Sequence, residues 1–370
     1  MYLNYKISVF LSFTETFIPN LQPQKMKPFL FAIWLFCTTI IQMANGQSPA
    51  IDRDAFFKDT SLLNATLVVN MSKILNHNNK KGFDMTGTFI TTLPDGTNVN
   101  DQILVEKRGH FRSDFCYVPP VKLIFNYRDS ARLYSLKSMK LVSECKVSQD
   151  HEQFLFKEYL AYKIYNLLCS KSFQVRLLNI KWEDTVGKKQ KTIREYGFLL
   201  EDLKDVASRN NCTEWKRNKL NTEQTDRRQM TMVAIFEYMI GNTDWAVTVD
   251  HNTRLILSRD DTLAKPYVVP YDFDYSGLVN TYYSIPDEKL EIESVTQRVY
   301  RGFPRTMPEL QIVLDTFRMR KKNIYDLINN FNYLTPRSKK EMIGFLSDFY
   351  DMIENPKLVK SAFIDKARLE

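Results

Sequence analysis

The sequence predicts an α+β fold, in which a region rich in β-strands precedes a region made mostly of helices. Short runs of strand-forming residues, separated by turn signals, dominate residues 85–201. From residue 229 onward, apolar residues recur every three or four positions, as on one face of a helix. The chain has 370 residues, 44% of them hydrophobic, which is enough for a large core. Strands followed by helices, rather than alternating with them, are typical of the α+β class.

The beginning of the chain has the composition of an export signal. A basic start at Lys27 precedes the apolar stretch 29–41, and the small residues Ala44 and Gly46 suit cleavage after the latter. The apolar stretch is short for a membrane span. We therefore expect residues 1–46 to be an N-terminal extension and signal peptide. The mature protein is expected in the periplasm, on the cell surface or outside the cell, without a stable membrane span.

The charge balance favours an anionic partner. The chain holds 51 Lys and Arg against 43 Asp and Glu, a net charge of +8. This suits a nucleotide or an anionic lipid, but no long run of Lys or Arg appears, so nucleic acid is not expected. Cys116 and Cys145 could pair in an oxidising compartment, although spacing does not establish connectivity. Without a Cys-x-x-Cys motif or a His-Cys cluster, zinc is not expected either.

The β-rich region contains several short strand signals and one helix. Pro94-Asp95-Gly96 predicts a turn between two of the strands, because Gly supplies a positive φ. The helix is expected over residues 156–167, where apolar residues line one face and Glu158 lies near its edge. Strands are expected at residues 85–92, 102–107, 121–125, 133–134, 140–142, 175–180 and 196–201, and a segment of alternating residues precedes them at 65–71.

The second half of the chain contains the strongest helix signal, at residues 229–240. Thr222 or Thr225 could cap its N-terminus, and Gly241 ends it. Residues 210–225 read as an exposed connection. A short strand is expected at residues 267–269, and further helices at residues 310–330, 338–353 and 358–368.

Acidic and amide side chains gather between the end of this helix and residue 277. Asp244 follows the helix end, Asn252 follows a His, and Asp272 and Asp274 follow the strand signal at 267–269. One carboxylate that orients a hydroxyl, with an Asn and a second carboxylate that hold magnesium on phosphates, is the set that phosphoryl transfer uses. Asp and Asn are also ordinary turn residues, so loop chemistry alone is the competing interpretation.

Six motifs in a fixed order resemble the CotH family of secreted, atypical protein kinases and, more distantly, the HipA-like kinases. The resemblance covers roughly residues 100–280. The motifs similar to the CotH family are KRG at 107–109, PVKLIF at 120–125, KEYLAY at 157–162, GFLLE at 197–201 and PYDFD at 270–274, and GNTD at 241–244 resembles the HipA-like group.

This resemblance implies a two-lobed, atypical protein-kinase-like fold with a β-rich N-lobe and a mainly helical C-lobe. Residues 47–100 would be a partly β N-terminal segment, residues 101–202 the N-lobe and residues 203–370 the C-lobe. It also implies that the protein binds ATP and Mg²⁺ or Mn²⁺, and that it transfers phosphate to a protein or another hydroxyl-bearing acceptor.

The resemblance also implies roles for single residues in the acidic stretch and the helix. Asp244 would accept or orient the proton of the acceptor hydroxyl. Asn252 and Asp272 would ligate the metal, with Asp274 as the competing ligand. A lysine paired with Glu158 would contact the α- and β-phosphates.

The remaining implied roles fall in the β-rich region. Lys140 is the preferred phosphate lysine, because it precedes Glu158 by one strand and one helix start. Lys122 and Lys146 are the alternatives. Glu201 and Asp202 would lie at the adenine edge. Arg108 and Arg112 would screen phosphate charge.

Three alternatives stay open. A kinase-like protein without phosphoryl transfer is favoured by Asn252, which lies eight positions after Asp244, and by the missing Gly-rich loop. A glycan hydrolase would use Asp244 and Asp272 as a carboxylate pair. Lys140 and Glu158 could instead form a surface ion pair of under about 1 kcal/mol. Serine hydrolysis is not expected, since there are only four His and no G-x-S-x-G motif.

Overall fold

The computed structural model describes residues 50–76, 82–109, 116–144, 148–185, 192–216, 219–261 and 263–368. Residues 49–370 form one compact unit. The expectations for residues 1–46, and those for Arg112, Cys145 and Lys146, lie outside the described residues. Within them, no helix combines the length and the apolar character needed to cross a membrane.

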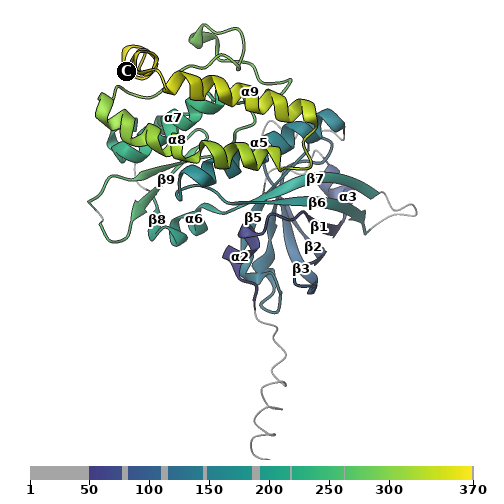
Figure 1. The fold of residues 1–370 in the computed structure, drawn as a ribbon. Helices are drawn as coiled ribbons and strands as arrows, with labels where there is room; N and C mark the ends of the chain where they lie inside the picture. Colours follow the sequence, from purple (N-terminus) through teal and green to yellow (C-terminus); the bar gives the residue numbers. More distant parts are fainter. Residues whose placement is uncertain are drawn as a thin grey trace, which may run out of the picture. The chain divides into compact units, whose positions relative to one another are not determined.

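Seven strands close into a barrel in the order β1-β2-β3-β4-β5-β7-β6 (Figure 1). All neighbouring pairs are antiparallel except β1 and β6, whose parallel pairing closes the barrel. Its interior is apolar, and the indole N–H of the fully buried Trp182 donates to Glu195 Oε1 at 2.7 Å. The strands are β1 (Leu63–Val69), β2 (Asp84–Thr92), β3 (Asn98–Lys107), β4 (Val121–Ile124), β5 (Ser138–Ser143), β6 (Val175–Asp184) and β7 (Thr192–Leu200).

This barrel makes the prediction of a two-lobed, atypical protein-kinase-like fold wrong. β1 and β2, from the segment separated as residues 47–100, belong to the same closed sheet as the later strands. β1 runs parallel to β6, with Leu63 opposite Leu178. The motifs that carried the resemblance are local, whereas closure depends on this pairing between strands more than one hundred residues apart. Of the predicted fold class, the order of strands before helices remains.

Most of the described helices lie on one side of the barrel (Figure 1). The helices predicted at 229–240, 310–330 and 338–353 are present, and the segment after residue 356 divides into a short helix and a π-helical turn. The longer helices are α5 (Gln149–Leu168), α7 (Arg227–Ile240), α8 (Met307–Asn329) and α9 (Pro336–Ile353). The shorter elements are α2 (Arg53–Lys58), α3 (Met71–Leu75), α6 (Leu203–Arg209), α10 (Pro356–Lys360) and η6 (Ser361–Asp365).

Two local predictions differ from the structure. The strand expected at 133–134 is replaced by the 3₁₀ turn η2 (Tyr134–Leu136). The reason is that the buried Asp101 carboxylate accepts the backbone N–H groups of Arg132 at 3.0 Å and Leu133 at 2.7 Å, which removes them from any ladder. The connection expected over residues 210–225 is largely exposed, but it contains a short strand, of which only Cys212 is buried. That strand, β8 (Cys212–Glu214), pairs with β9 (Thr253–Ser258), which also pairs with β10 (Tyr267–Pro270).

Helix α5 joins the barrel to the helical region. Because it is packed on nearly all sides, it has no marked polar face, as is usual for a fully buried helix. Its Tyr165 ring lies 4.5 Å from Phe236 of α7, and its Tyr162 ring lies 4.6 Å from Phe273, measured between ring centres. These aromatic contacts fix α7 and the segment after β10 against one support.

Helix α7 positions the loop that follows it. Asp226, rather than Thr222 or Thr225, caps its N-terminus by accepting the Gln229 N–H at 2.8 Å. At the other end Gly241 has φ +67 and its N–H donates to the carbonyls of the last turn, which confirms the predicted helix stop.

Replacing Gly241 with alanine is expected to destabilise the fold by about 1–2 kcal/mol, because an L-residue disfavours this left-handed conformation. The new Cβ would also lie 3.0 Å from Phe345 Cζ and 3.2 Å from the Val295 carbonyl oxygen. Urea unfolding measures the loss. Gly344→Ala is the matched control, since Gly344 lies inside α9 with open space around it and should gain up to about 1 kcal/mol. Equal stability of the two variants would contradict the argument.

Candidate functional site

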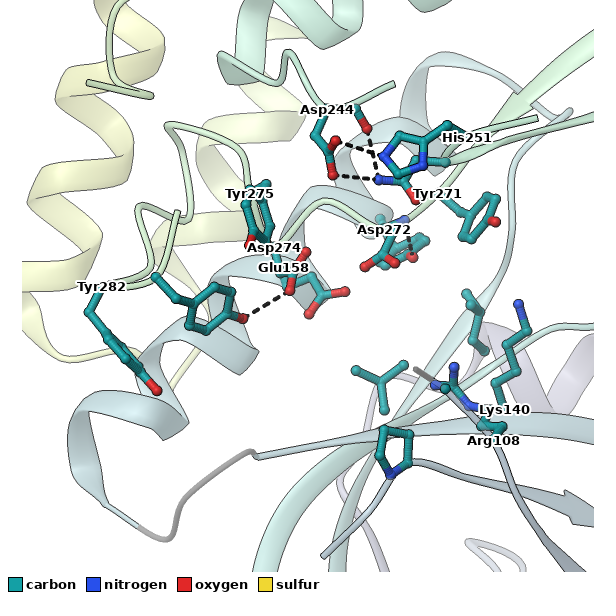
Figure 2. A pocket seen from close by; sticks show the side chains of 17 residues that line it. Arg108, Lys140, Glu158, Asp244, His251, Tyr271, Asp272, Asp274, Tyr275 and Tyr282 are labelled. Atoms are coloured by element: carbon teal, nitrogen blue, oxygen red, sulfur yellow. Dashed lines mark hydrogen bonds and ion pairs between the residues drawn. The ribbon is translucent and has the colours of Figure 1, made fainter. Parts of the chain in front are cut away.

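A cavity of about 450 Å³ lies between the barrel and the helical region (Figure 2). This volume is in the usual range for small-molecule sites. Most of the site residues predicted from the sequence line it, whereas Glu201 and Lys122 do not. Those that do are Arg108, Lys140, Glu158, Asp244, Asn252, Asp272 and Asp274.

Asp244 is held by its neighbours in a fixed orientation. Its N–H donates to Asn242 Oδ1 at 3.0 Å. The Asn252 amide donates to Asp244 Oδ2 at 2.9 Å and to the Asp244 carbonyl oxygen at 2.8 Å. The His251 Nε2 lies 2.7 Å from Asp244 Oδ1. With 38% of its side chain exposed, the carboxylate remains open to a ligand.

The eight-residue spacing between Asp244 and Asn252 is closed by a tight turn. The N–H and carbonyl groups of Ala246 and His251 bond reciprocally at 3.0 Å, and the chain reverses between them. Asn252 has φ +49, a conformation that Asn tolerates better than most residues. The turn therefore returns the Asn252 side chain to Asp244 despite the spacing.

A buried carboxyl group lies beneath this loop. Glu237, on the last turn of α7, accepts the Asn242 amide at Oε2 over 2.9 Å and is 1% exposed. Burial raises the pKa of Glu237 to about 8, and Asp244 adds to the rise. Glu237 is therefore mostly neutral at pH 7, so it adds little negative charge next to Asp244.

Asp272 and Asp274 reach the cavity from the segment after β10. Phe273 between them is fully buried against Tyr162 and Phe236, and both carboxylates line the cavity. Asp272 has φ +68 and donates its N–H to the Tyr162 hydroxyl at 2.8 Å. Asp274 Oδ2 accepts the hydroxyl of Tyr283 at 2.9 Å. A strained backbone at Asp272, held by a buried helix, is a frequent feature of functional sites.

The barrel contributes positive charge to the cavity. Lys140 on β5 has its Nζ 5.0 Å from the centre of the Tyr271 ring. Burial lowers the pKa of Lys140 to about 8, and Arg108 and Arg254 add to the fall. Arg108 is anchored by donating to the carbonyl oxygens of Val121 at 3.2 Å and Leu141 at 3.3 Å. Figure 2 shows Lys140 and Arg108 on one side of the cavity, and Asp244 and Asp272 on another.

Glu158 lines the same cavity from α5 and is 3% exposed. In Figure 2 it approaches the cavity from a different side than Lys140. The structure thus brings both members of the predicted lysine–glutamate pair to one cavity. Lys122 lies one strand further round the barrel, where its Nζ is 3.6 Å from Glu106.

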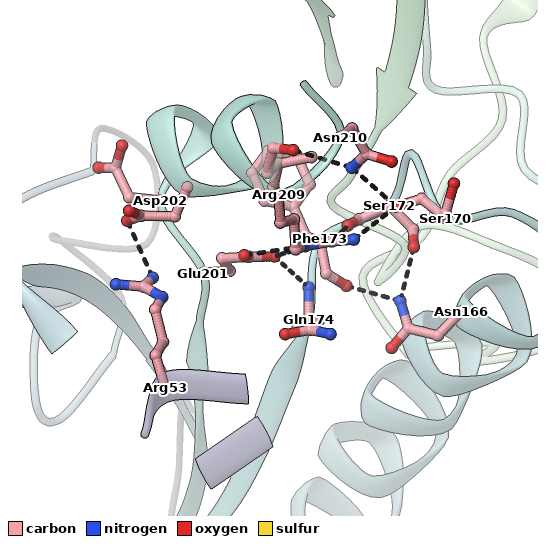
Figure 3. Close-up of polar contacts among 12 residues, drawn as sticks. Arg53, Asn166, Ser170, Ser172, Phe173, Gln174, Glu201, Asp202, Arg209 and Asn210 are labelled. Atoms are coloured by element: carbon pink, nitrogen blue, oxygen red, sulfur yellow. Dashed lines mark hydrogen bonds and ion pairs between the residues drawn. The ribbon is translucent and has the colours of Figure 1, made fainter. Parts of the chain in front are cut away.

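Glu201 has a structural role away from the cavity (Figure 3). It is 2% exposed, lies 3.1 Å from Arg209 Nε and accepts the Gln174 N–H at 2.9 Å. Burial raises the pKa of Glu201, and Arg209 opposes the rise. Asp202 caps α6 by accepting the Lys204 N–H at 3.0 Å. Neither carboxylate lines the cavity.

Replacing Glu201 with glutamine is expected to cost roughly 3 kcal/mol of unfolding free energy, because one partner of a buried ion pair is removed. Arg209 would lose its negatively charged partner and keep its contacts to the carbonyl oxygens of Ser170 and Ser172, with one oxygen of the new glutamine left as an acceptor. Urea unfolding should show the loss. An unchanged midpoint would contradict the structural role.

Several cavity residues were not assigned a role from the sequence. His251 forms a hydrogen bond with Asp244, and Tyr283 donates one to Asp274. The Tyr271 ring packs against Lys140 and against Arg254, whose guanidinium lies 4.8 Å from the ring centre. For His251 a signal existed, because it directly precedes Asn252 in the sequence. Tyr283 lies in an irregular segment, so no periodicity could have indicated it.

No family model matches this chain, and a search of curated proteins finds no match. Within the described residues, no group of three or more His, Cys, Asp or Glu side chains could hold a metal ion. The described residues therefore do not form a metal site made of protein ligands alone. Mg²⁺ is commonly held instead by one or two carboxylates together with the phosphates of a substrate. Asp272 and Asp274, which line a cavity with Lys140 and Arg108, fit that arrangement.

Proposed function

We propose that this cavity binds ATP with Mg²⁺ or Mn²⁺ and transfers the γ-phosphate to a hydroxyl-bearing acceptor. The observation that carries the proposal is the separation of charge in one cavity. Lys140 and Arg108 come from the barrel, and Asp244, Asp272 and Asp274 come from the helical region. Cations that meet phosphates, and carboxylates that meet a metal and a hydroxyl, are the parts that phosphoryl transfer requires.

Each residue has a definite task in this proposal. Lys140 and Arg108 hold the phosphates. Asp272 and Asp274 hold the cation, which when bound neutralises phosphate charge. Asp244 takes the proton of the acceptor hydroxyl as the new oxygen–phosphorus bond forms. The bond between the γ-phosphorus and the bridging oxygen breaks, and ADP leaves with that electron pair.

His251 and Asn252 prepare Asp244 for its task. Asn252 fixes one carboxylate oxygen and His251 contacts the other. These two contacts fix the orientation of the carboxylate. Such preorganisation lowers the cost of reaching the transition state.

The resemblance of the ordered motifs to CotH kinases supports the same activity, on a barrel rather than on the architecture it implied. A disulfide at Cys116 suits the proposed export to an oxidising compartment. A glycan hydrolase is less well supported, because Lys140 and Arg108 have no task in carboxylate-pair chemistry. A nucleotide-binding module without transfer is the second candidate. It is favoured by the Tyr283 hydroxyl on Asp274, which occupies one oxygen of a proposed metal ligand.

Calorimetric titration of the protein with ATP tests the proposal. We expect ATP to bind at least tenfold more tightly with Mg²⁺ than with EDTA, and Asp272→Asn to remove most of that difference. Release of labelled ADP from [α-³²P]ATP then separates the two candidates. ATP binding without any turnover would favour the binding module, and failure to bind ATP would reject both.

A further inference from the structure

A second cavity, of about 370 Å³, adjoins the first at Asp244. Asp244, His251 and Tyr275 line both cavities. If the first cavity holds the nucleotide, a molecule in the second reaches the proposed base from another direction. Phosphoryl transfer needs this layout, because donor and acceptor must meet at one carboxylate without sharing one space.

Arg301 is the charged group of this second cavity that lacks a close carboxylate. Its guanidinium donates to the carbonyl of Thr243, directly before Asp244, and lies 5.8 Å from the centre of the Trp245 ring. Among the ion pairs between described residues, Arg301 has none, whereas the nearby Arg305 pairs with Glu223 at 2.6 Å. A half-buried guanidinium with unused donors is suited to bind a carboxylate or a phosphate.

Arg368 repels Arg301, and the carboxylates that attract it, Asp287, Asp244 and Glu237, form no ion pair with it within the described residues. Asp287 attracts the Arg301 guanidinium, but the Asp287 side chain is exposed and its Oδ1 accepts the Lys289 N–H at 3.0 Å. Asp244 is held by His251 and Asn252. A ligand anion at Arg301 would therefore gain a desolvated cation, and it would lie beside the carboxylate that takes the hydroxyl proton.

The rim of the second cavity is apolar and open to solvent. Ile285 is 76% exposed and Val249 is 58% exposed, and both line it. Each offers apolar surface that a side chain of a bound ligand could cover. A small hydroxy acid would fill the cavity but leave the rim exposed. A peptide would fill the cavity and also cover the rim.

We propose that the second cavity binds the acceptor, and that the acceptor is a peptide segment with a carboxylate close to its reacting serine or threonine hydroxyl. The carboxylate pairs with Arg301, the hydroxyl reaches Asp244, and a neighbouring apolar side chain packs on Ile285 and Val249. This inference rests on the proposed function, since it assigns the acceptor side of the same reaction.

Binding of labelled peptide pools to the full chain tests it without requiring transfer. Two fluorescein-labelled pools of eleven-residue peptides carry a central serine and mixed apolar residues. One has Asp and Glu at the remaining positions, and the other has Lys and Arg. By anisotropy, we expect the acidic pool to bind at least about tenfold more tightly than the basic pool.

Two variants and one control locate the binding. Ile285→Asp should weaken acidic-pool binding by about tenfold, and Arg301→Gln should abolish the preference between pools. Leu263→Asp is the control, because Leu263 is 94% exposed and does not line the cavity, so it should bind like the parent. Because Arg301 also supports the Thr243 carbonyl, circular dichroism must show that its variant is folded. If the Arg301→Gln variant is unfolded, Ile285→Asp alone still tests the proposed acceptor site.

The possible outcomes separate this inference from the proposed function. Equal binding of both pools, or unchanged binding in Ile285→Asp, overturns the acceptor site. The expected pool preference in a protein that fails to bind ATP would reject the proposed function and keep a peptide site. ATP binding without measurable peptide binding would reject the acceptor site alone.

Discussion

Asp244→Asn is expected to lower the rate of phosphate transfer by about 10²–10⁴-fold, the range typical of a lost general base. The substitution keeps the size of the side chain and removes the basic oxygen, so ATP affinity should stay within about threefold. Turnover of [γ-³²P]ATP under saturating ATP measures the rate, and calorimetry measures the affinity. A loss of rate without a loss of affinity would place Asp244 at the reacting hydroxyl and not at the nucleotide.

The matched control is Asp250→Asn, on the same turn. Asp250 is exposed and has φ +55, a conformation that Asn also accepts. It does not line the cavity proposed to bind ATP, so its rate should equal that of the parent. If Asp244→Asn turned over ATP as fast as Asp250→Asn, the role given to Asp244 would be wrong.

The position of Asp244 on a loop directly after helix α7 could be predicted, because the sequence signals for it are local. The apolar stripe at 229–240, a helix-ending Gly241 and an acid three residues later lie within one short stretch of sequence. Short-range periodicity and one left-handed cap are sufficient to place such a loop. The N-terminal cap was missed because several capping residue types stand before α7, and only the fold decides that Asp226 is used.

Closure of the barrel could not be predicted in the same way. The parallel register of β1 with β6 joins Leu63 to Leu178, and nothing in either segment specifies the other. The choice among lysines has a similar cause. Lys122 and Lys140 are opposite each other on neighbouring strands, so they share one face of the sheet. Only the position of each strand around the barrel decides which of them meets the cavity.

Glu201 shows the limit of carrying a role over from a resemblance. The GFLLE motif is at the end of β7, as expected for a strand that leads into the helical region. Its carboxylate nevertheless pairs with Arg209, eight residues later on α6. The sequence contained both residues, but an ion pair between a strand end and the following helix depends on how sharply the chain turns at Asp202.

Lys140→Met is expected to weaken ATP binding by about 10–100-fold, the loss of one or two charge-assisted contacts to phosphate. Methionine keeps most of the length and the apolar contact with Tyr271, so the barrel should fold normally. Calorimetric titration at pH 7 measures the change. Lys122→Met is the matched control, since Lys122 shares the sheet face but lies one strand away from the cavity, beside Glu106.

The pH dependence of ATP binding gives this prediction a second readout. Burial lowers the pKa of Lys140 to about 8, so below pH 8 the free protein already carries the ammonium. Bound phosphates favour the charged form and raise this pKa. Above pH 8 binding must therefore take up a proton, and affinity should fall by up to about tenfold per pH unit. The fall should be absent in Lys140→Met and retained in Lys122→Met. A parent whose affinity is constant from pH 7 to 9.5 would show that Lys140 does not contact the phosphates.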